Sequence, residues 1–244
     1  MPQLPPSLLR WHAAADPTVT LAQTLVDPQR GIILTADADE GEIVGPVYAE
    51  TWSQAVPSWQ AESPAGTAIE VLLRAHIDDR WTRWYSLGSW SEEGAHRHSV
   101  TGQSDADADV VTDTLILHQP AHALQWRVVL RGAEGASPAL RCIAVALAPH
   151  AAVTDTIPPR AVGPLPVPEL SQMVYPGGGP VWCSPTSLTM LLGYWAARIN
   201  APDLARFTDP RSVPDIVAPA VYDSVYDGTG NWPFMEGRCT GRRG

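Results

Sequence analysis

Cys183 is the residue of this sequence whose surroundings best suit nucleophilic chemistry. It stands at the start of the segment 184–199, in which apolar residues recur at helical spacing. The amino terminus of a helix carries about half a positive charge, which favours the thiolate form of a cysteine. The thiolate is the form that attacks. The pattern therefore predicts a helix that activates the Cys183 thiol.

A glycine-rich loop, PGGGP at 176–180, precedes this cysteine. Glycine lets a backbone approach a substrate closely because it has no side chain. Pro185 falls in the predicted first helical turn, where a missing N–H costs nothing. Asn200 and Pro202 predict the end of the helix.

The segment 170–195, LSQMVYPGGGPVWCSPTSLTMLLGYW, resembles the C39-like peptidase superfamily, a papain-like group of cysteine peptidases. The matching elements are Gln172, the loop, Cys183, Pro185 and Ser187. The resemblance implies that Cys183 is the nucleophile and that Gln172 donates its amide to an oxyanion hole. The Cys183 backbone N–H would be the second donor, and such a donor contributes roughly 3–4 kcal/mol. The stretch 213–234 and the β-rich front half also resemble this family, so the likeness extends from about residue 40 to 234. It implies a peptide or protein substrate.

The sequence departs from this family in its histidines. Papain-like chemistry needs a histidine base downstream of the cysteine, oriented by Asp or Asn. All seven histidines precede Cys183, namely His12, His76, His96, His98, His118, His122 and His150. Two explanations are open, a chain truncated or frameshifted after Phe234 and a short non-catalytic variant. We favour truncation, and we expect the 244-residue chain to be inactive or nearly so.

Composition bounds the remaining function classes. The net charge is −10 and no basic stripe is present, so nucleic acid is not an expected partner. No apolar run of 18 residues occurs, which predicts no transmembrane segment. The N-terminus has no basic start and no long apolar stretch, so it predicts no secretory signal, and the compartment stays unknown. The three cysteines form no CxxC pair, which argues against structural zinc, and no cofactor is expected.

The predicted fold class is α+β, an antiparallel β-sandwich followed by a partial papain-like domain. Residues 40–148 contain short strand-like runs between Gly, Asp, Pro and Ser clusters. Residues 149–167 are proline-rich and predict an extended linker. We therefore expect an N-terminal extension at 1–39, a sandwich at 40–148, this linker, and the first part of a C39-like domain at 168–244. Cys142 is expected in the sandwich core.

Several other motifs have simpler interpretations. His96 and His98 lack a third metal ligand, so a solvated strand or loop is favoured. The acidic run 104–113 lacks the glycine and glutamate of a calcium loop and predicts a solvated turn. Asp223 and Asp227 lie in turn chemistry near Gly228, within a second, weaker helical stretch at 209–228 that Pro219 interrupts. Cys239, in a polar tail at 235–244 expected to be disordered, is interpreted as an incidental exposed thiol.

A non-enzymatic function is the alternative. The chain has ten tryptophans, and in this alternative the sandwich binds carbohydrate, including cell-wall material, or peptide. The competing interpretation is that the tryptophans fill the sandwich core. The candidates for a stacking platform are Trp52, Trp59, Trp81, Trp84 and Trp90.

Overall fold

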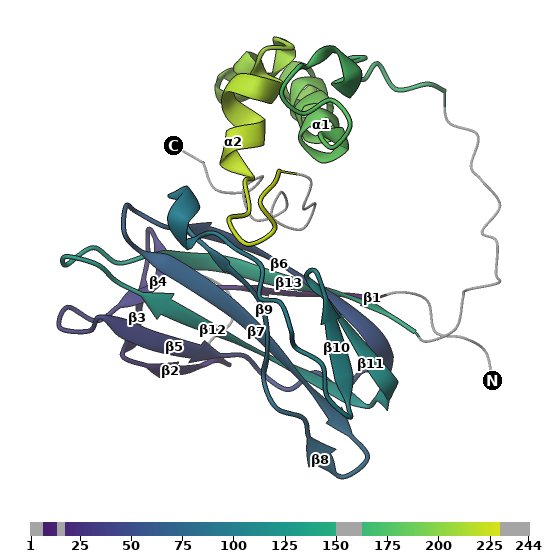
Figure 1. Cartoon of the computed structure of the whole chain (residues 1–244). Coiled ribbons are helices and arrows are strands. Elements are labelled where there is room, and N and C mark those ends of the chain that lie inside the picture. The colour runs from purple at the N-terminus through teal and green to yellow at the C-terminus, as the bar shows by residue number, and fades with distance from the viewer. Residues whose placement is uncertain (1–6, 14–17, 150–162, 230–244) are drawn as a thin grey trace. The chain divides into compact units, whose positions relative to one another are not determined.

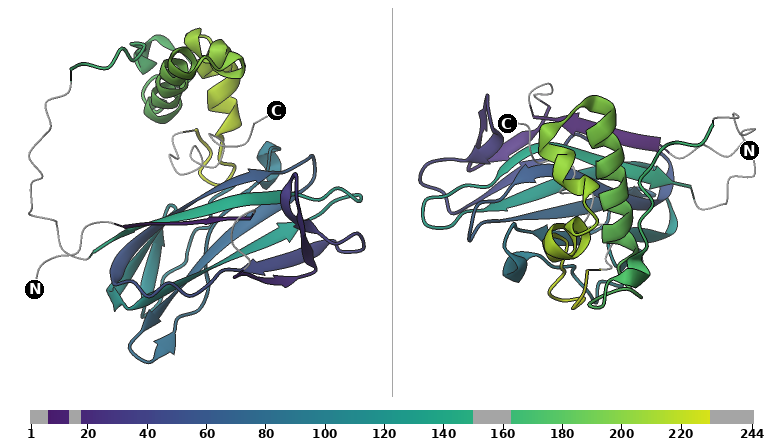
Figure 2. Two further views of the ribbon diagram at one scale, coloured as in Figure 1. Left: turned by 180° about the vertical axis from the view of Figure 1, so that it is seen from behind. Right: turned by 90° about the horizontal axis from the view of Figure 1, so that it is seen from above.

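The computed structural model of the chain describes residues 7–13, 18–149 and 163–229. These residues fall into two compact units, 7–149 and 163–229. The first unit is a sandwich of two antiparallel sheets (Figure 1), and Figure 2 shows the same strands from behind and from above. The structure thus confirms the predicted class, a β-sandwich followed by a smaller unit that contains helices.

The first sheet has seven strands in the order β10-β11-β6-β13-β4-β3, with β1 paired to β13. Its strands are β1 (Ser7–His12), β3 (Thr24–Asp27), β4 (Gly31–Leu34), β6 (Trp52–Glu62), β10 (Ala108–Val111), β11 (Thr114–Ala121) and β13 (Ala139–Ala148). The second sheet has six strands in the order β2-β5-β12-β7-β8, with β9 paired to β7. Its strands are β2 (Thr20–Ala22), β5 (Glu40–Val44), β7 (Ala68–Ile77), β8 (Arg80–Trp81), β9 (Tyr85–Trp90) and β12 (Ala123–Arg131).

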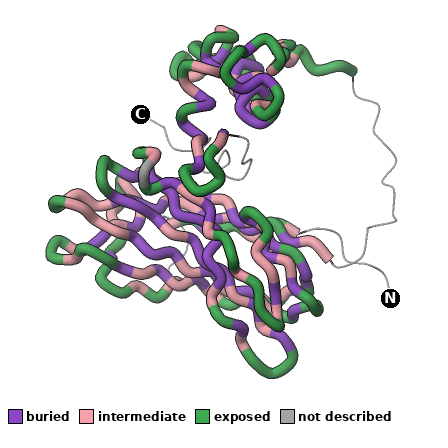
Figure 3. The backbone as a smooth tube through the Cα atoms, viewed as in Figure 1, coloured by how far each residue is buried: buried purple, intermediate pink, exposed green. Residues whose placement is uncertain are grey.

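The core lies between the two sheets, where buried residues of the longer strands gather (Figure 3). Trp11 on β1 and Trp126 on β12 join the sheets, with ring centroids 5.2 Å apart. A Cβ on Gly45 would lie 2.1 Å from the Trp126 indole, so only glycine leaves room for that ring. The large aromatic side chains therefore fill this core, as the simpler interpretation of the tryptophans predicts.

The prediction of an N-terminal extension at 1–39 needs correction, because its strands are part of the sandwich. β1, β3 and β4 belong to the first sheet, and β2 belongs to the second. Trp11 of β1 is buried opposite Ile143 of β13, far along the chain. These strands are three to six residues long, too short for alternation to be recognised in the sequence. Their long-range pairing cannot be seen in a local window.

The predicted burial of Cys142 also needs correction, since this residue is half-buried rather than in the core. The register between β13 and β6 shifts between Leu140 and Cys142, as at a β-bulge. A shift of one residue reverses which side chains face inward. Leu140 is therefore followed in the core by Ile143 and Val145, and Cys142 faces outward.

The second unit is built on helix α1 (Cys183–Ile199), which ends at Asn200 in the left-handed conformation. Leu188 of α1 packs with Phe207 and Val217 in a small core. The other helical pieces are η2 (Gln172–Val174), η3 (Pro202–Thr208), η4 (Val213–Val217) and α2 (Ala218–Ala220).

The second helical stretch predicted at 209–228 is shorter, covering 213–220. Pro214 and Pro219 each remove a backbone donor from it. The linker predicted at 149–167 falls mostly outside the described residues, and its boundaries stay a prediction. The tail at 235–244 and Cys239 also lie outside them.

Candidate functional site

Cys183 is exposed and is the first residue of α1. The preceding residue, Trp182, provides no side-chain cap for the helix. The first backbone N–H groups of a helix have no intrahelical acceptor. Thr186 N–H donates to the Trp182 carbonyl at 3.1 Å. The N–H groups of Cys183 and Ser184, by contrast, have no backbone acceptor among the described residues. The thiol thus stands beside uncapped amides, at the positive end of the helix.

Gln172 is held against the glycine-rich loop that leads to Cys183. Its Nε2 donates to the Gly179 carbonyl at 2.6 Å. Ser171 caps the short helix η2, because its Oγ accepts from the Met173 N–H at 3.3 Å. Gly179 packs so closely that a Cβ there would lie 3.2 Å from the Gln172 carbonyl oxygen. One N–H of the Gln172 amide is therefore engaged by the loop, and its side chain is half-buried.

Two aromatic residues that sequence reasoning missed hold this loop in place. Tyr175 is buried, and its hydroxyl donates to the Pro210 carbonyl at 2.9 Å. The Trp182 ring lies 6.2 Å from the Tyr175 ring, and it lies so near Gly178 that a Cβ would be 1.9 Å from it. The only signal for these roles in the sequence is an aromatic residue on each side of the PGGGP loop.

A cysteine–histidine contact exists in the chain, but in the sandwich. Cys142 Sγ lies 3.9 Å from His12 Nε2, and the two residues are directly opposed on β13 and β1. Burial raises the pKa of the Cys142 thiol, and the nearby Arg10 charge opposes this only in part. A raised pKa reduces the thiolate fraction, so this pair lacks the property that a nucleophile needs.

Helix α1 also carries exposed apolar side chains. Residues 183, 187, 191, 195 and 199 recur every four positions, so each lies about 40° further round the helix than the one before, and only neighbours in this row share a side. Leu191, Trp195 and Ile199 in this row are 52%, 47% and 59% exposed. We call these five positions the exposed row. Leu188 and Leu192, by contrast, face Phe207 and Val217.

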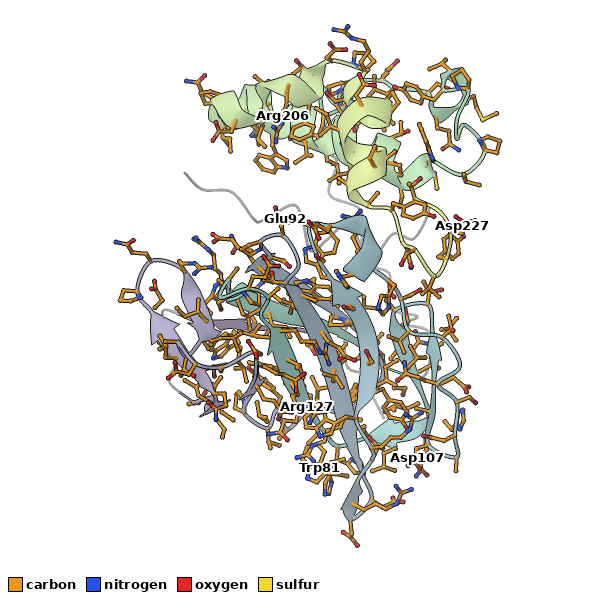
Figure 4. The ribbon with its side chains drawn as sticks, turned by 60° about the vertical axis from the view of Figure 1, so that its left-hand side comes forward. Trp81, Glu92, Asp107, Arg127, Arg206 and Asp227 are labelled. Atoms are coloured by element: carbon orange, nitrogen blue, oxygen red, sulfur yellow. The ribbon has the colours of Figure 1, made fainter. Side chains whose placement is uncertain are left out.

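The acidic run at 104–113 has a structural role. Asp105 accepts hydrogen bonds from Arg83, Tyr85 and the backbone. Asp107, which Figure 4 labels, pairs with Arg80. Asp109 accepts from His118 at 2.9 Å. Groups of this chain thus occupy the carboxylates of Asp105, Asp107 and Asp109. The predicted solvated turn covers only part of the run, because residues 108–111 form β10 and Asp113 is buried.

The remaining motifs also have structural roles. Asp223 is buried and accepts from the Val225 and Tyr226 N–H groups, which confirms the turn prediction there. His96 is exposed, and His98 Nδ1 lies 3.1 Å from the Ser99 carbonyl. Within the described ranges, no group of three acidic, histidine or cysteine side chains could hold a metal ion. A cavity of about 330 Å³ beside Arg30 and Ser137 contains neither predicted site residue.

The five platform tryptophans separate into two groups. Trp52, Trp59 and Trp90 are buried in the sandwich, with 0%, 5% and 2% exposure. Trp81 and Trp84 are half-buried on the second sheet, beside Arg74. Only these two remain candidates for contact with a ligand.

No helix among the residues that the structure describes is long and apolar enough to cross a membrane. Residues 9–148 match the family model of the Peptidase C39 N-terminal domain, over more than half of the chain. Residues 164–242 match the model of the Peptidase_C39 like family. No curated protein sequence matches the chain.

Among solved structures, the chain is similar to a family two carbohydrate esterase from Cellvibrio japonicus, with 13% identity and a TM-score of 0.31. That match covers 59% of this chain and 34% of the esterase chain, about a third of its length. The xylan-binding module CBM15 matches with 16% identity and a TM-score of 0.30, over 59% of this chain and 99% of that module. The module CBM29_1 from Piromyces equi, a Family 29 Carbohydrate Binding Module, matches with 13% identity and a TM-score of 0.30. This match covers 60% of this chain and 94% of that module.

Proposed function

The chain belongs to the family of the Peptidase C39 N-terminal domain, and from this premise we propose that its second unit presents half of a cysteine-peptidase active site. Cys183 is the nucleophile, and Gln172 and the Cys183 N–H are the oxyanion donors. The histidine base is not among the residues that follow Cys183 in this sequence. The observation that supports this proposal most is an exposed thiol at an uncapped helix start, behind a glycine loop tied to Gln172.

In this proposal the chain supplies the nucleophile and the oxyanion donors but not the histidine. Cys183 Sγ attacks the carbonyl carbon of a peptide bond, a C–S bond forms, and an electron pair moves to the oxygen. The Cys183 N–H and the second N–H of the Gln172 amide donate to that oxygen. The C–N bond then breaks, but the leaving amine needs a proton from a general acid, which is the protonated histidine in papain-like enzymes. A substrate with a better leaving group needs no such acid.

The exposed row on α1 supports the proposal that another segment supplies the base. Leu191 and Trp195 are exposed neighbours in this row, on the helix whose first residue is Cys183. Exposed apolar side chains that lie together mark surfaces that bind another protein segment. We propose that the segment carrying the base packs on these side chains of α1.

The test uses 4-nitrophenyl acetate, whose leaving group departs without a proton. We expect one equivalent of 4-nitrophenolate per chain, with the acetyl group on Cys183 by mass spectrometry and none transferred in Cys183→Ala. Gln172→Ala should slow acylation about tenfold or more, whereas Gln172→Glu keeps the length of the side chain but loses the donor. Added imidazole should speed deacylation of the wild-type chain more than it speeds hydrolysis with Cys183→Ala.

Fluorogenic peptides should not be cleaved by the 244-residue chain alone. Peptide turnover that disappears in Cys183→Ala would show that the chain holds a working base, and would refute the half-site. Acetylation spread equally over Cys142, Cys183 and Cys239 would instead refute the activated nucleophile.

A further inference from the structure

Four side chains stack in alternation on the outer face of the second sheet. The Arg74 guanidinium lies 4.5 Å from the ring centroids of both Trp81 and Trp84, and the Arg127 guanidinium lies 4.9 Å from Trp84. We call the set Trp81, Arg74, Trp84 and Arg127 the ladder. His76 adds an edge contact to Trp81, with ring centroids 5.0 Å apart. Figure 4 shows Trp81 and Arg127 on the same part of the sandwich.

The strand register explains why these side chains meet. Arg74 on β7 is opposite Gln125 on β12, and His76 is opposite Trp81 on β8. Directly opposed residues of antiparallel strands point to the same face of the sheet. The alternation of β7 and β12 puts Ile69, Val71 and Leu73 into the core and leaves the ladder outside. Arg74, Arg127 and Trp81 are therefore on strands of this sheet, and Trp84 is on the short segment 82–84 that joins β8 to β9.

Arg74 is a cation without a carboxylate partner within the residues that the structure covers. Its Nε and Nη2 both donate to the neutral Oε1 of Gln125, at 3.0 Å and 2.5 Å. Gln125 is fixed in that orientation, because its Nε2 donates to the Gly45 carbonyl at 2.8 Å. Neither of these hydrogen bonds uses the Arg74 Nη1.

The neighbouring charges do not neutralise this cation. Arg127 lies 3.4 Å from Glu42, and Arg131 holds both Glu40 and Glu70. Burial lowers the pKa of Arg74, and the charge of Arg127 lowers it further. Both arginines thus lie over the Trp84 indole, and the nearby carboxylates, Glu42 and Glu70, interact with Arg127. On a chain of net charge −10, this is a local site where an anion reduces repulsion.

The shape of the site favours a sugar polymer over a peptide. Indole rings contact the C–H faces of sugars, while guanidinium and amide groups bind hydroxyls and carboxylates. A peptide would gain its affinity by adding a strand to a sheet edge, through main-chain hydrogen bonds. The ladder is on a sheet face, where the backbone groups of β7 and β12 are already paired with each other. A ligand on this face can therefore contact only side chains.

We propose that the ladder is a binding site for an acidic polysaccharide, a chain of sugars that carry carboxylates. A carboxylate binds Arg74 through a charge-assisted hydrogen bond, and sugar C–H groups contact those parts of the half-buried Trp81 and Trp84 rings that the arginines do not cover. This site is on the first unit and does not depend on Cys183. It would hold the chain on an anionic glycan whether or not the second unit performs chemistry.

Isothermal titration of the full chain with oligogalacturonates tests the proposal, with uncharged galacto-oligosaccharides and poly-L-glutamate as the comparison ligands. We expect heat of binding with the galacturonates alone. Arg74→Ala and Trp84→Ala should each weaken binding about tenfold or more, since each removes a direct contact. Arg10→Ala, which removes an equally charged, exposed residue from the other sheet, should change affinity less than about twofold.

Each other result overturns the proposal in a distinct way. Equal binding of poly-L-glutamate would show a site for acidic peptides, and equal binding of the neutral sugars would show that the cation plays no part. An equal loss in Arg10→Ala would reduce the effect to net charge. If Arg74→Ala does not fold, Arg74→Lys retains the charge without the planar group and should still weaken binding. Absence of any heat with the wild-type chain would refute the site without use of a variant.

Discussion

The glycine loop before Cys183 allows a sharp test, because two adjacent glycines differ in one property. A Cβ on Gly178 would lie 1.9 Å from Cε2 of Trp182, whereas a Cβ on Gly177 would lie 3.6 Å from the nearest atom of the same ring. Carbon atoms in contact are separated by about 3.5–4.0 Å. Neither glycine has a positive φ, so alanine strains the backbone at neither position. The matched variants Gly178→Ala and Gly177→Ala therefore differ in steric fit alone.

The expected loss of stability follows from the distance that the Trp182 ring would have to move. To admit the methyl group of Gly178→Ala, the ring must move by about 1.5 Å or more, away from a Tyr175 ring that is fixed to Pro210. Overpacking of this kind costs about 1–3 kcal/mol. The middle of that range, ~2 kcal/mol, corresponds to about a 30-fold increase in the population of the open loop.

Native-state hydrogen exchange measures that population directly. The Trp182 amide donates to the Gly178 carbonyl at 2.9 Å, and the Thr186 amide donates to the Trp182 carbonyl at 3.1 Å. Both amides should exchange about 30-fold faster in Gly178→Ala and less than about threefold faster in Gly177→Ala. Equal exchange in the two variants, or no change in Gly178→Ala, would show that the indole does not hold the loop before Cys183.

Two further predictions concern titrating groups. Iodoacetamide at neutral pH should label the exposed Cys183 faster than Cys142, whose thiol pKa is raised by burial, and peptide mapping would reveal a reversed order if that reasoning is wrong. Burial raises the pKa of Asp105, but hydrogen bonds from Arg83, the Asp107 amide and Tyr85 outweigh it and hold the pKa well below its usual range. This carboxylate therefore stabilises the fold above its unfolded pKa of about 3.9, and the contribution is lost as pH falls through the folded pKa. Asp105→Asn should accordingly lower Tm at pH 7, and its gap from the wild type should narrow as pH falls below about 3.9. A constant gap at all pH values would contradict this origin.

The sequence was sufficient wherever the signal was local. The helical spacing after Cys183 and the end signal at Asn200 predicted α1 closely, because a helix depends on neighbours three and four residues away. The short strand-like runs between clusters of turn residues likewise predicted the sandwich. The turn at Asp223 followed from the tendency of aspartate to accept hydrogen bonds from the backbone N–H groups that follow it.

What the sequence did not predict depends on contacts between distant segments. The strands before residue 40 are recognised only through partners such as β13, and a bulge reversed the facing of Cys142. The ladder requires the register of β7 against β12 before Arg74 is known to lie between two indoles. At the cysteine, the roles of Tyr175 and Trp182 appear only once the loop is folded.

The apolar pattern of α1 has more members than the core of its own unit uses. Leu188, Leu191, Leu192 and Trp195 read as one amphipathic stripe, yet Leu188 and Leu192 pack inward while Leu191 and Trp195 are exposed. A helix that covers one core needs a single apolar face, and apolar residues on a further side indicate burial there too. Under the proposed function, a segment packed on Leu191 and Trp195 would bury these side chains of the helix that begins at Cys183, and would bring the base that the mechanism needs.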